Sequence, residues 1–321
     1  MSILITGVAG FIGSNLAKRF VSEGKNVVGF DNLCRGSLTN IESLSGHSRF
    51  AFCQVDLAAP EFYRTAMKGF HEKLPITEVW HMAANSDIPA GVENLQVDLR
   101  DTFMTTVNTL QVMKELRIRV IAFASSSAIY GDLGEVRIGE DIGPLFPISN
   151  YGAMKLASEA VISAAVEDDL EQAYIFRFPN VIGIPATHGV MLDFIRKLKV
   201  TPERLDVLGD GTQQKSYLHV AELIDAMLFI REHAADQINY FNIGADDDGV
   251  TVSYIAEQVV ATVAPTASIS YGKGNKGWVG DVPKFAYSTE KLRKLGWHPK
   301  LKSAEAIRRA VRQIAEQESR Q

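Results

Sequence analysis

The residues of this sequence best suited to chemistry are a run of serines, a tyrosine and a lysine. Ser125-Ser126-Ser127 ends a short apolar segment, Tyr151 follows 24 to 26 residues later, and Lys155 stands four residues beyond it. Tyrosine and lysine at this spacing share one helix face. An ammonium group nearby favours phenolate, so we expect it to lower the pKa of Tyr151 until the phenol can act as a base near neutral pH. A serine hydroxyl from this run could bridge Tyr151 and a substrate hydroxyl.

The elements that must position these residues begin at the first apolar run, Ile3–Ile5. Three glycines follow it at three-residue spacing, Gly7, Gly10 and Gly13, and a helical pattern continues over 15–21. Strand, glycine turn and helix together form a site for pyrophosphate: the glycines permit the tight turn and the close approach of the backbone. The helix start then offers free N–H groups to the anion.

A second apolar run, 27–30, ends in Asp31, which stands 18 residues past the last glycine. An acid at this point suits the hydroxyl pair of a ribose, and its charge would repel a 2′-phosphate. We therefore expect NAD rather than NADP, although Arg35 nearby leaves NADP open. Asp56 ends the next predicted strand, 50–55, where it could meet an adenine amino group, cap the following helix, or do both.

Strands and helices alternate along the first half of the chain. Further strands are predicted at 76–81 and 120–124, with a helix over 94–117 between them. This rhythm implies a doubly wound parallel α/β sheet of the Rossmann type. We expect a dinucleotide-binding domain over 1–178, with 173–178 as its last regular strand. Residues 179–321 then form a smaller, discontinuous α/β substrate-binding lid, some segments of which return to the sheet.

The chain closes with an amphipathic helix over 303–317, whose apolar face carries Ile307, Val311 and Ile314.

The amino-acid composition is that of a globular protein. The chain has 321 residues, of which 46% are hydrophobic and 22% charged, and these values are typical of a globular protein with a substantial core. A net charge of −5 argues against a nucleic-acid surface. Cys34 and Cys53 have no metal-type spacing, so we expect neither a metal nor a structural disulfide. Without a membrane-length apolar run or room for a signal peptide, the sequence predicts a soluble, cytoplasmic protein.

The chain resembles an extended short-chain dehydrogenase/reductase of the NAD-dependent nucleotide-sugar epimerase/dehydratase family. The resemblance runs nearly end to end, through the three glycines, Asp31-Asn32-Leu33, Asp56-Leu57, His81-Met-Ala-Ala, the serine run, Tyr151-x-x-x-Lys155, Arg177-Phe-Pro-Asn180, Gly209-Asp-Gly-Thr, Tyr217-Leu-His-Val and Leu295-Gly-Trp297.

The resemblance implies three sets of site residues. The catalytic set is Ser126, Tyr151 and Lys155. Cofactor contacts are expected from Gly7, Gly10, Phe11, Ile12, Gly13, Asp31, Asn32, Arg35, Gly36, Asp56, Leu57, Met82, Ala83, Ala84, Ser125, Tyr151, Lys155 and Pro179. Substrate contacts are expected from Asn85, Ser126, Tyr151, Asn180, Val190, Lys215 and Phe285.

The implied activity is 4-epimerisation of a nucleotide-activated hexose with tightly bound NAD, with UDP-glucose and UDP-galactose as the leading pair. Dehydration is disfavoured because Ser126 is followed by Ser127-Ala128 and not by the Asp-Glu pair of the dehydratases. Another nucleotide-sugar epimerase, a 4-keto-sugar reductase and a non-catalytic NAD-binding protein remain alternatives. A bulky Phe285 beside the sugar 2-position would disfavour N-acetylated substrates.

The sequence departs from the family pattern at two places. Trp278 stands where an arginine commonly grips the diphosphate, and Lys276 or Arg196 could compensate. Asp101 or Thr102 replaces an asparagine that usually contacts the cofactor. The resemblance also implies a homodimer formed by the helices around 94–117 and 151–166, which carry apolar residues such as Leu95, Leu99, Leu156 and Val161.

Overall fold

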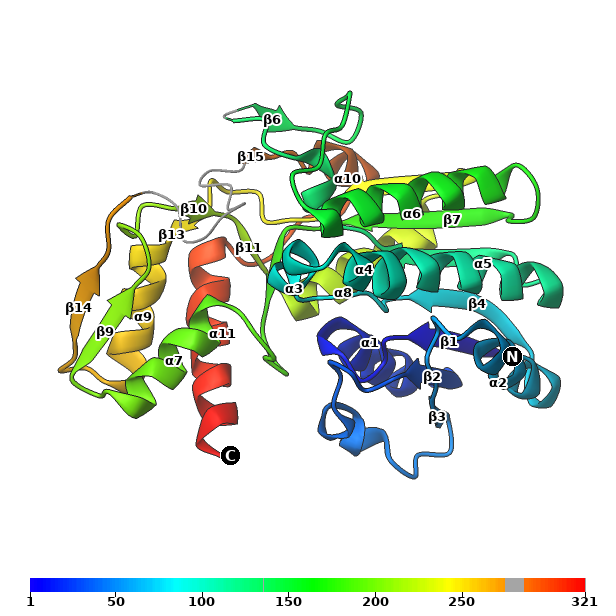
Figure 1. Ribbon diagram of the computed structural model, residues 1–321, viewed down its shortest axis with the longest axis horizontal. Coiled ribbons are helices and arrows are strands. Elements are labelled where there is room, and N and C mark those ends of the chain that lie inside the picture. The colour runs from blue at the N-terminus through cyan, green and yellow to red at the C-terminus, as the bar shows by residue number, and fades with distance from the viewer. Residues whose placement is uncertain (135, 275–285, 321) are drawn as a thin grey trace. The chain divides into compact units, whose positions relative to one another are not determined.

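The computed structural model describes residues 1–134, 136–274 and 286–320, and the chain folds into two compact units (Figure 1). Unit 1 consists of Met1–Gly131, Gly143–Arg177 and Met227–Phe241. Unit 2 consists of Asp132–Ile142, Phe178–Ala226 and Asn242–Gln321. Neither unit is a single continuous stretch of the chain.

Unit 1 is built around a seven-stranded sheet with the strand order β12-β7-β5-β4-β1-β2-β3. The strands are β1 (Ser2–Thr6), β2 (Val27–Asp31), β3 (Phe50–Gln54), β4 (Ile76–His81), β5 (Val120–Ala124), β7 (Gln172–Arg177) and β12 (Ile238–Asn242). The pairs from β3 through to β7 are parallel. The strand order reverses between β1 and β4, and at such a point the carboxyl ends of the strands form a ligand site. The predicted doubly wound parallel sheet is confirmed.

Helices cover both faces of this sheet. They are α1 (Phe11–Ser22), α2 (Pro60–Lys73), α3 (Ile88–Glu93), α4 (Leu95–Asp98), α5 (Thr105–Leu116) and α6 (Asn150–Val166), with short 3₁₀ segments η1 (Leu38–Leu44) and η3 (Ser127–Tyr130) and the π-helix η2 (Leu99–Met104). On one face Met67 of α2, Val112 of α5 and Ile162 of α6 pack on buried strand residues such as Val79. On the other face Phe20 of α1 meets Trp80 edge-on, with ring centroids 5.2 Å apart.

One expectation for this unit needs correction. The helix expected over 94–117 is divided into α4, η2 and α5; the Asn94 side chain caps α4 by accepting from Gln96 N–H at 3.0 Å, and the π-turns of η2 pack against α6. From the second half of the chain, β12 joins this sheet beside β7, and the Ala173 N–H donates to the Gln237 carbonyl at 2.8 Å.

Unit 2 contains short paired strands and helices. Its strand pairs are β8 (Asn180–Ile182) with β11 (Tyr217–His219), β9 (Arg204–Val207) with β14 (Ser268–Tyr271), β10 (Gln214–Lys215) with β13 (Val250–Thr251), and β6 (Arg137–Ile138) with β15 (Ala286–Tyr287). Its helices are α7 (Val190–Val200), α9 (Val252–Val263), α10 (Glu290–Leu295) and α11 (Ser303–Ser319), and α8 (Val220–His233) begins in it.

The core of unit 2 lies between α7, α9 and α11. Ile307, Val311 and Ile314 are all buried there, as expected from the apolar face of the last helix. Residues 132–142 belong to this unit, whereas the sequence analysis placed them in the first domain. They are held there because β6 pairs with β15 and Glu140 accepts the Asn242 N–H at 2.9 Å.

Candidate functional site

The glycine turn lies at the point where the strand order reverses. Gly7 has φ +66°, and a Cβ placed on it would lie 2.8 Å from the Ala83 nitrogen at the end of β4. A Cβ on Gly13 would lie 2.1 Å from the Gly7 carbonyl oxygen. Gly10 stands at the N-cap of α1 and makes no side-chain cap hydrogen bond. Glycine is therefore required at two of the three positions, and the turn fits a pyrophosphate.

Asp31 lies at the carboxyl end of β2, directly beside this turn. Its carboxylate is buried and accepts the Ala9 N–H at 2.9 Å and the Leu33 N–H at 2.8 Å. Burial raises the pKa of Asp31, and the two backbone hydrogen bonds oppose that rise. A Cβ on Gly36 would lie 2.9 Å from Asp31 Oδ1, so Gly36 leaves room around the carboxylate. Phe11 and Ile12, two further expected contacts, open α1.

Charged residues around this turn form ion pairs. Arg35 pairs with Asp87, and Arg100 pairs with both Asp56 and Asp101. Asp56 Oδ1 accepts the Ala58 N–H at 2.9 Å, but the residue that caps α2 is Ala59, so Asp56 is not the helix cap. The Leu57 carbonyl accepts from the Asn108 side chain at 2.8 Å, and Asn32 Oδ1 accepts the Cys34 N–H at 3.0 Å.

Ser126, Tyr151 and Lys155 lie together in unit 1. Ser126 follows β5, and its Oγ accepts the Ala128 N–H at 3.2 Å at the start of η3. Tyr151 and Lys155 stand in the first turns of α6, whose cap is Ser149. The Lys155 ammonium lies 5.8 Å from the Tyr151 ring centroid and donates to the Ala124 carbonyl at 2.5 Å.

The charges of this set differ from the expectation. Burial raises the pKa of Tyr151 to about 12, hydrogen bonding to Ser126 lowers it, and the Asp98 carboxylate raises it. Burial lowers the pKa of Lys155 to about 7. The expected lowering of the Tyr151 pKa by Lys155 is therefore not found in this structure, because loss of hydration dominates both groups.

A buried ion pair behind this set was missed by the sequence analysis. Glu159 accepts from the guanidinium of Arg177 at 2.7 Å and from the Ser125 hydroxyl, and Arg177 also donates to the Tyr130 hydroxyl at 2.9 Å. The Ser125 hydroxyl is thus engaged by Glu159. The signal for Glu159 was its position, four residues after Lys155 on the same face of the helix.

The residues that follow β4 form a loop with several internal hydrogen bonds. Met82, Ala83 and Ala84 follow the strand, with the Ala83 N–H donating to the Thr6 hydroxyl at 3.3 Å. Asn85 is buried, and its amide group donates at 2.8 Å to both the Asp87 carbonyl and Asp98 Oδ1. Both amide hydrogens are used within the protein, so Asn85 supports this loop, and its contact with the substrate stays a prediction. Thr102, one of the two replacements for the family asparagine, accepts the Asn85 N–H at 3.1 Å.

The remaining predicted contacts belong to unit 2. Pro179 precedes β8, Asn180 opens it, Val190 begins α7 and Lys215 ends β10. The Asn180 side chain donates to the Ser216 carbonyl at 3.4 Å, which brings it close to the residue after Lys215. Arg196 pairs with Glu318 at 3.1 Å, so it is engaged elsewhere. Lys276, Trp278 and Phe285 lie outside the described residues.

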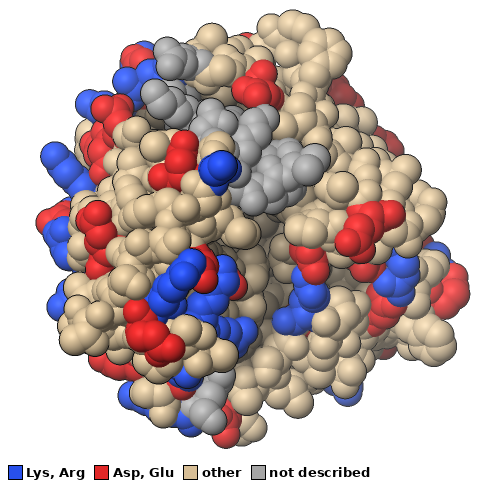
Figure 2. All heavy atoms as spheres, turned by 60° about the vertical axis from the view of Figure 1, so that its left-hand side comes forward, with Lys and Arg blue, Asp and Glu red and all other residues tan. Residues whose placement is uncertain are grey.

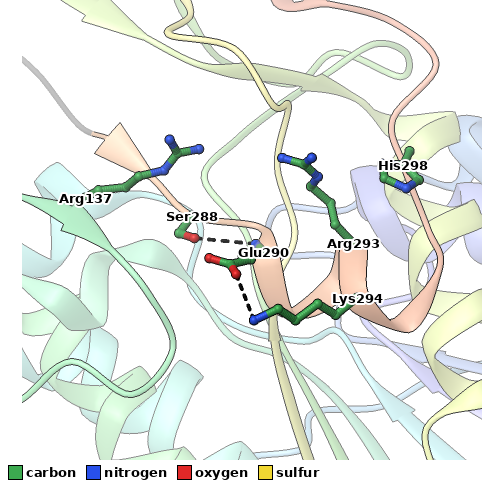
Figure 3. A pocket seen from close by; sticks show the side chains of 6 residues that line it. All are labelled: Arg137, Ser288, Glu290, Arg293, Lys294 and His298. Atoms are coloured by element: carbon green, nitrogen blue, oxygen red, sulfur yellow. Dashed lines mark hydrogen bonds and ion pairs between the residues drawn. The ribbon is translucent and has the colours of Figure 1, made fainter.

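Unit 2 also has a hollow in its surface. Figure 3 shows a hollow lined by Arg137, Ser288, Glu290, Arg293, Lys294 and His298, in which Lys294 pairs with Glu290 at 2.7 Å. None of the predicted site residues that the structure describes lines it. On the face drawn in Figure 2, acidic and basic side chains are interspersed.

Membrane spans and metal clusters are both absent from the described part of the chain. No helix there is long and apolar enough to span a membrane. Within the same ranges no group of three His, Cys, Asp or Glu residues could hold a metal ion.

A glycine turn at the strand-order reversal, a buried acid at the end of β2 and a serine–tyrosine–lysine set are typical of a dinucleotide-dependent enzyme of hydride chemistry. The model of the NAD dependent epimerase/dehydratase family matches residues 3–244, and the chain belongs to that family.

Known proteins are similar over almost the whole chain. A crystal structure of a UDP-galactose 4-epimerase is 30% identical, with a TM-score of 0.85 and 99% of both chains covered. The UDP-glucose 4-epimerase of Thermus thermophilus, solved in complex with NAD, is 27% identical, with a TM-score of 0.84 and 98% and 99% covered. The UDP-glucuronate 4-epimerase of Thermodesulfobacterium geofontis is 25% identical, with 96% of this chain and 94% of the relative covered.

Proposed function

We propose that this protein interconverts the C4 epimers of a UDP-hexose, with UDP-glucose and UDP-galactose as its substrates. The observation that carries the proposal is the grouping of Ser126, Tyr151 and Lys155 in the unit that also contains the glycine turn and Asp31. NAD supplies the acceptor and donor of hydride when bound. The two glycines that exclude a Cβ and the buried acid fit its pyrophosphate and ribose.

The side chains of unit 1 then have separate duties. Tyr151 removes the proton of the sugar 4-hydroxyl, and the Ser126 hydroxyl lies on the path of that proton because it is hydrogen-bonded to Tyr151. Lys155 would hold a ribose of bound NAD and supply positive charge to the phenolate. After oxidation at C4, the 4-keto sugar turns over and the same residues return the proton. The net reaction leaves the oxidation state of the sugar unchanged.

The side chains of unit 2 are proposed to hold the nucleotide. Lys215 would supply a positive charge for the diphosphate, less directional than an arginine, and Asn180 and Val190 would contact the rest of the substrate. Phe285, which would restrict the sugar 2-position, lies outside the described residues.

Purified protein incubated with UDP-glucose should yield UDP-galactose by NMR without net production of NADH. UDP-glucuronate, UDP-GlcNAc and dTDP-glucose complete the panel. Stoichiometric use of NAD(P)H would instead identify a reductase, and no turnover of any sugar would favour a non-catalytic NAD-binding protein.

Tyr151→Phe should lower turnover by at least about 10²-fold with NAD still bound, because it removes the base and little packing. Tyr254→Phe is the matched control: this tyrosine lies in α9 of unit 2, with its hydroxyl 2.8 Å from Arg308. Near-normal activity of Tyr151→Phe would remove Tyr151 from the mechanism. Ser126→Ala should cost less, and a larger loss in Ser127→Ala would show that the neighbouring serine carries the role.

A homodimer is the second part of the proposal. Leu95 and Met104, in the segment of α4 and η2, are 46% and 38% exposed, and Leu99, Leu156 and Val161 are only half-buried. A symmetric pairing of these helices with those of a second copy would cover them. Light scattering at micromolar concentration should give the mass of a dimer; a monomer would contradict this part alone.

A further inference from the structure

Asp98 is a buried carboxylate to which the proposed mechanism gives no duty. It ends α4 and is 0% exposed. Its Oδ1 accepts from the Asn85 side chain at 2.8 Å, whereas its Oδ2 has no hydrogen-bond partner among the described residues. A buried acid with one unused oxygen is costly, and such a group needs an explanation.

The fold makes room for this carboxylate. A Cβ on Gly91 of α3 would lie 1.8 Å from Asp98 Oδ2, so only glycine fits there. Both α3 and α4 pack against α6, the helix that carries Tyr151 and Lys155 (Figure 1). The unused oxygen therefore lies where α3 and α4 pack near the helix that carries Tyr151 and Lys155.

The charge of Asp98 acts on two members of that set, Lys155 and Tyr151. Burial lowers the pKa of Lys155, and the carboxylates of Glu159 and Asp98 both raise it. Glu159 shares its charge with Arg177, whereas no ion pair of Asp98 is found among the described residues. Asp98 also raises the pKa of Tyr151.

Neighbouring groups shift the pKa of Asp98 in both directions. Burial and the like charges of Asp101 and Asp87 raise the pKa of Asp98, while the Asn85 hydrogen bond and Lys155 lower it. His81, which packs near Lys155, has its pKa lowered to about 3 by burial and so stays neutral through the working range.

We propose that Asp98 is a positioning residue of the epimerisation site: its buried carboxylate holds Asn85 just after the end of β4 and, together with that of Glu159, provides negative charge near Lys155. The inference rests on the proposed roles of Tyr151 and Lys155. It requires no bond to be made or broken at Asp98. Its consequence is a pH profile whose position depends on a residue that does not touch the substrate.

The test compares pH profiles of kcat/KM for UDP-glucose in wild type, Asp98→Asn and Glu93→Gln. Asparagine keeps the shape of Asp98 and can still accept from Asn85, but it lacks the charge. Both limbs of its profile should move to lower pH by about 1 unit, because the pKa values of Lys155 and Tyr151 both fall. Glu93 is an exposed acid of α3, and its variant should keep the wild-type profile.

Two further variants keep the test decisive if Asp98→Asn does not fold. Asp98→Ser should shift the profile as Asp98→Asn does, and Asp98→Glu, which retains the charge, should keep its position even with a lower kcat. An unshifted profile in the uncharged variants, or an equal shift in Glu93→Gln, would overturn the proposal. If Tyr151→Phe is fully active, the proposed catalytic set fails; if that variant is inactive and the Asp98 profiles coincide with wild type, only the role of Asp98 fails.

Discussion

Replacing Gly13 with alanine sets two effects of known sign against each other. Gly13 lies in α1, where alanine is favoured over glycine by about 1 kcal/mol. The added Cβ, however, would lie 2.1 Å from the Gly7 oxygen and 2.8 Å from the Gly7 carbonyl carbon. Ordinary contact begins at 3.4 Å, so about 1.3 Å of separation must be found.

The steric effect should win, because the atoms in the way are backbone atoms of the turn itself. Overpacking a close-packed site costs about 1–3 kcal/mol and sometimes more, and a rigid neighbour places this variant at the upper end. We expect Gly13→Ala to destabilise the protein by about 2 kcal/mol or more after the gain in helix propensity. Displacement of the turn by about 1 Å should weaken NAD binding by at least about 10-fold.

The assay measures two quantities: NAD released from purified protein by denaturation, and the thermal unfolding midpoint. Gly69→Ala is the matched control, since Gly69 also lies in a helix, α2, and a Cβ there would meet nothing within 4 Å. That variant should be about 0.5–1 kcal/mol more stable than wild type and keep its NAD. If Gly13→Ala behaves like Gly69→Ala, the steric explanation of the turn is wrong.

Three further predictions concern single side chains. Purified protein should contain NAD(H) and not NADP(H) by enzymatic cycling, because the Asp31 carboxylate repels a 2′-phosphate; mainly NADP(H) in the extract would contradict this. Arg177→Met should lower the urea-unfolding free energy by about 3–5 kcal/mol by leaving the buried Glu159 unpaired, and adding Glu159→Met should restore part of it. The pKa of Glu318 is lowered through its hydrogen bonds to Arg196 and Lys199, so its carboxylate stabilises the fold above its unfolded pKa and this is lost as pH falls through the folded pKa. Glu318→Gln should accordingly be less stable than wild type at about pH 7 and equal to it near about pH 3, and a constant difference would refute this.

Local patterns explain what could be predicted about the fold. A glycine triplet directly after an apolar run, and an acid at the end of the next run, depend on neighbouring residues alone, and the structure has β1, α1 and β2 there. The apolar face of the last helix is equally local, and Ile307 and Val311 are buried as its spacing implies.

Packing between residues far apart in the sequence explains the features of the fold that could not be predicted. β12 lies beside β7 although about 60 residues separate them in sequence, and nothing within Ile238–Asn242 signals that partner. The π-turns of η2 likewise depend on packing against α6, so periodicity alone predicted one uninterrupted helix. The position of Glu159 could have been found from its spacing to Lys155, but its pairing with Arg177 required the sheet.

Burial, which the sequence does not show, decides the charge states of the site. A lysine four residues after a tyrosine suggests a lowered phenol pKa, yet loss of hydration raises the pKa of Tyr151 and lowers that of Lys155. The two acids that act on Lys155, Glu159 and Asp98, differ in whether a positive side chain pairs with them. Glu159 is compensated by a guanidinium, and removing it would leave Arg177 unpaired and damage the fold. Among the described residues Asp98 accepts an amide hydrogen from Asn85 and forms no ion pair, so its charge remains available to Lys155 and can be removed by an isosteric change. Stability measurements should therefore respond most to Glu159, and the position of the pH profile to Asp98.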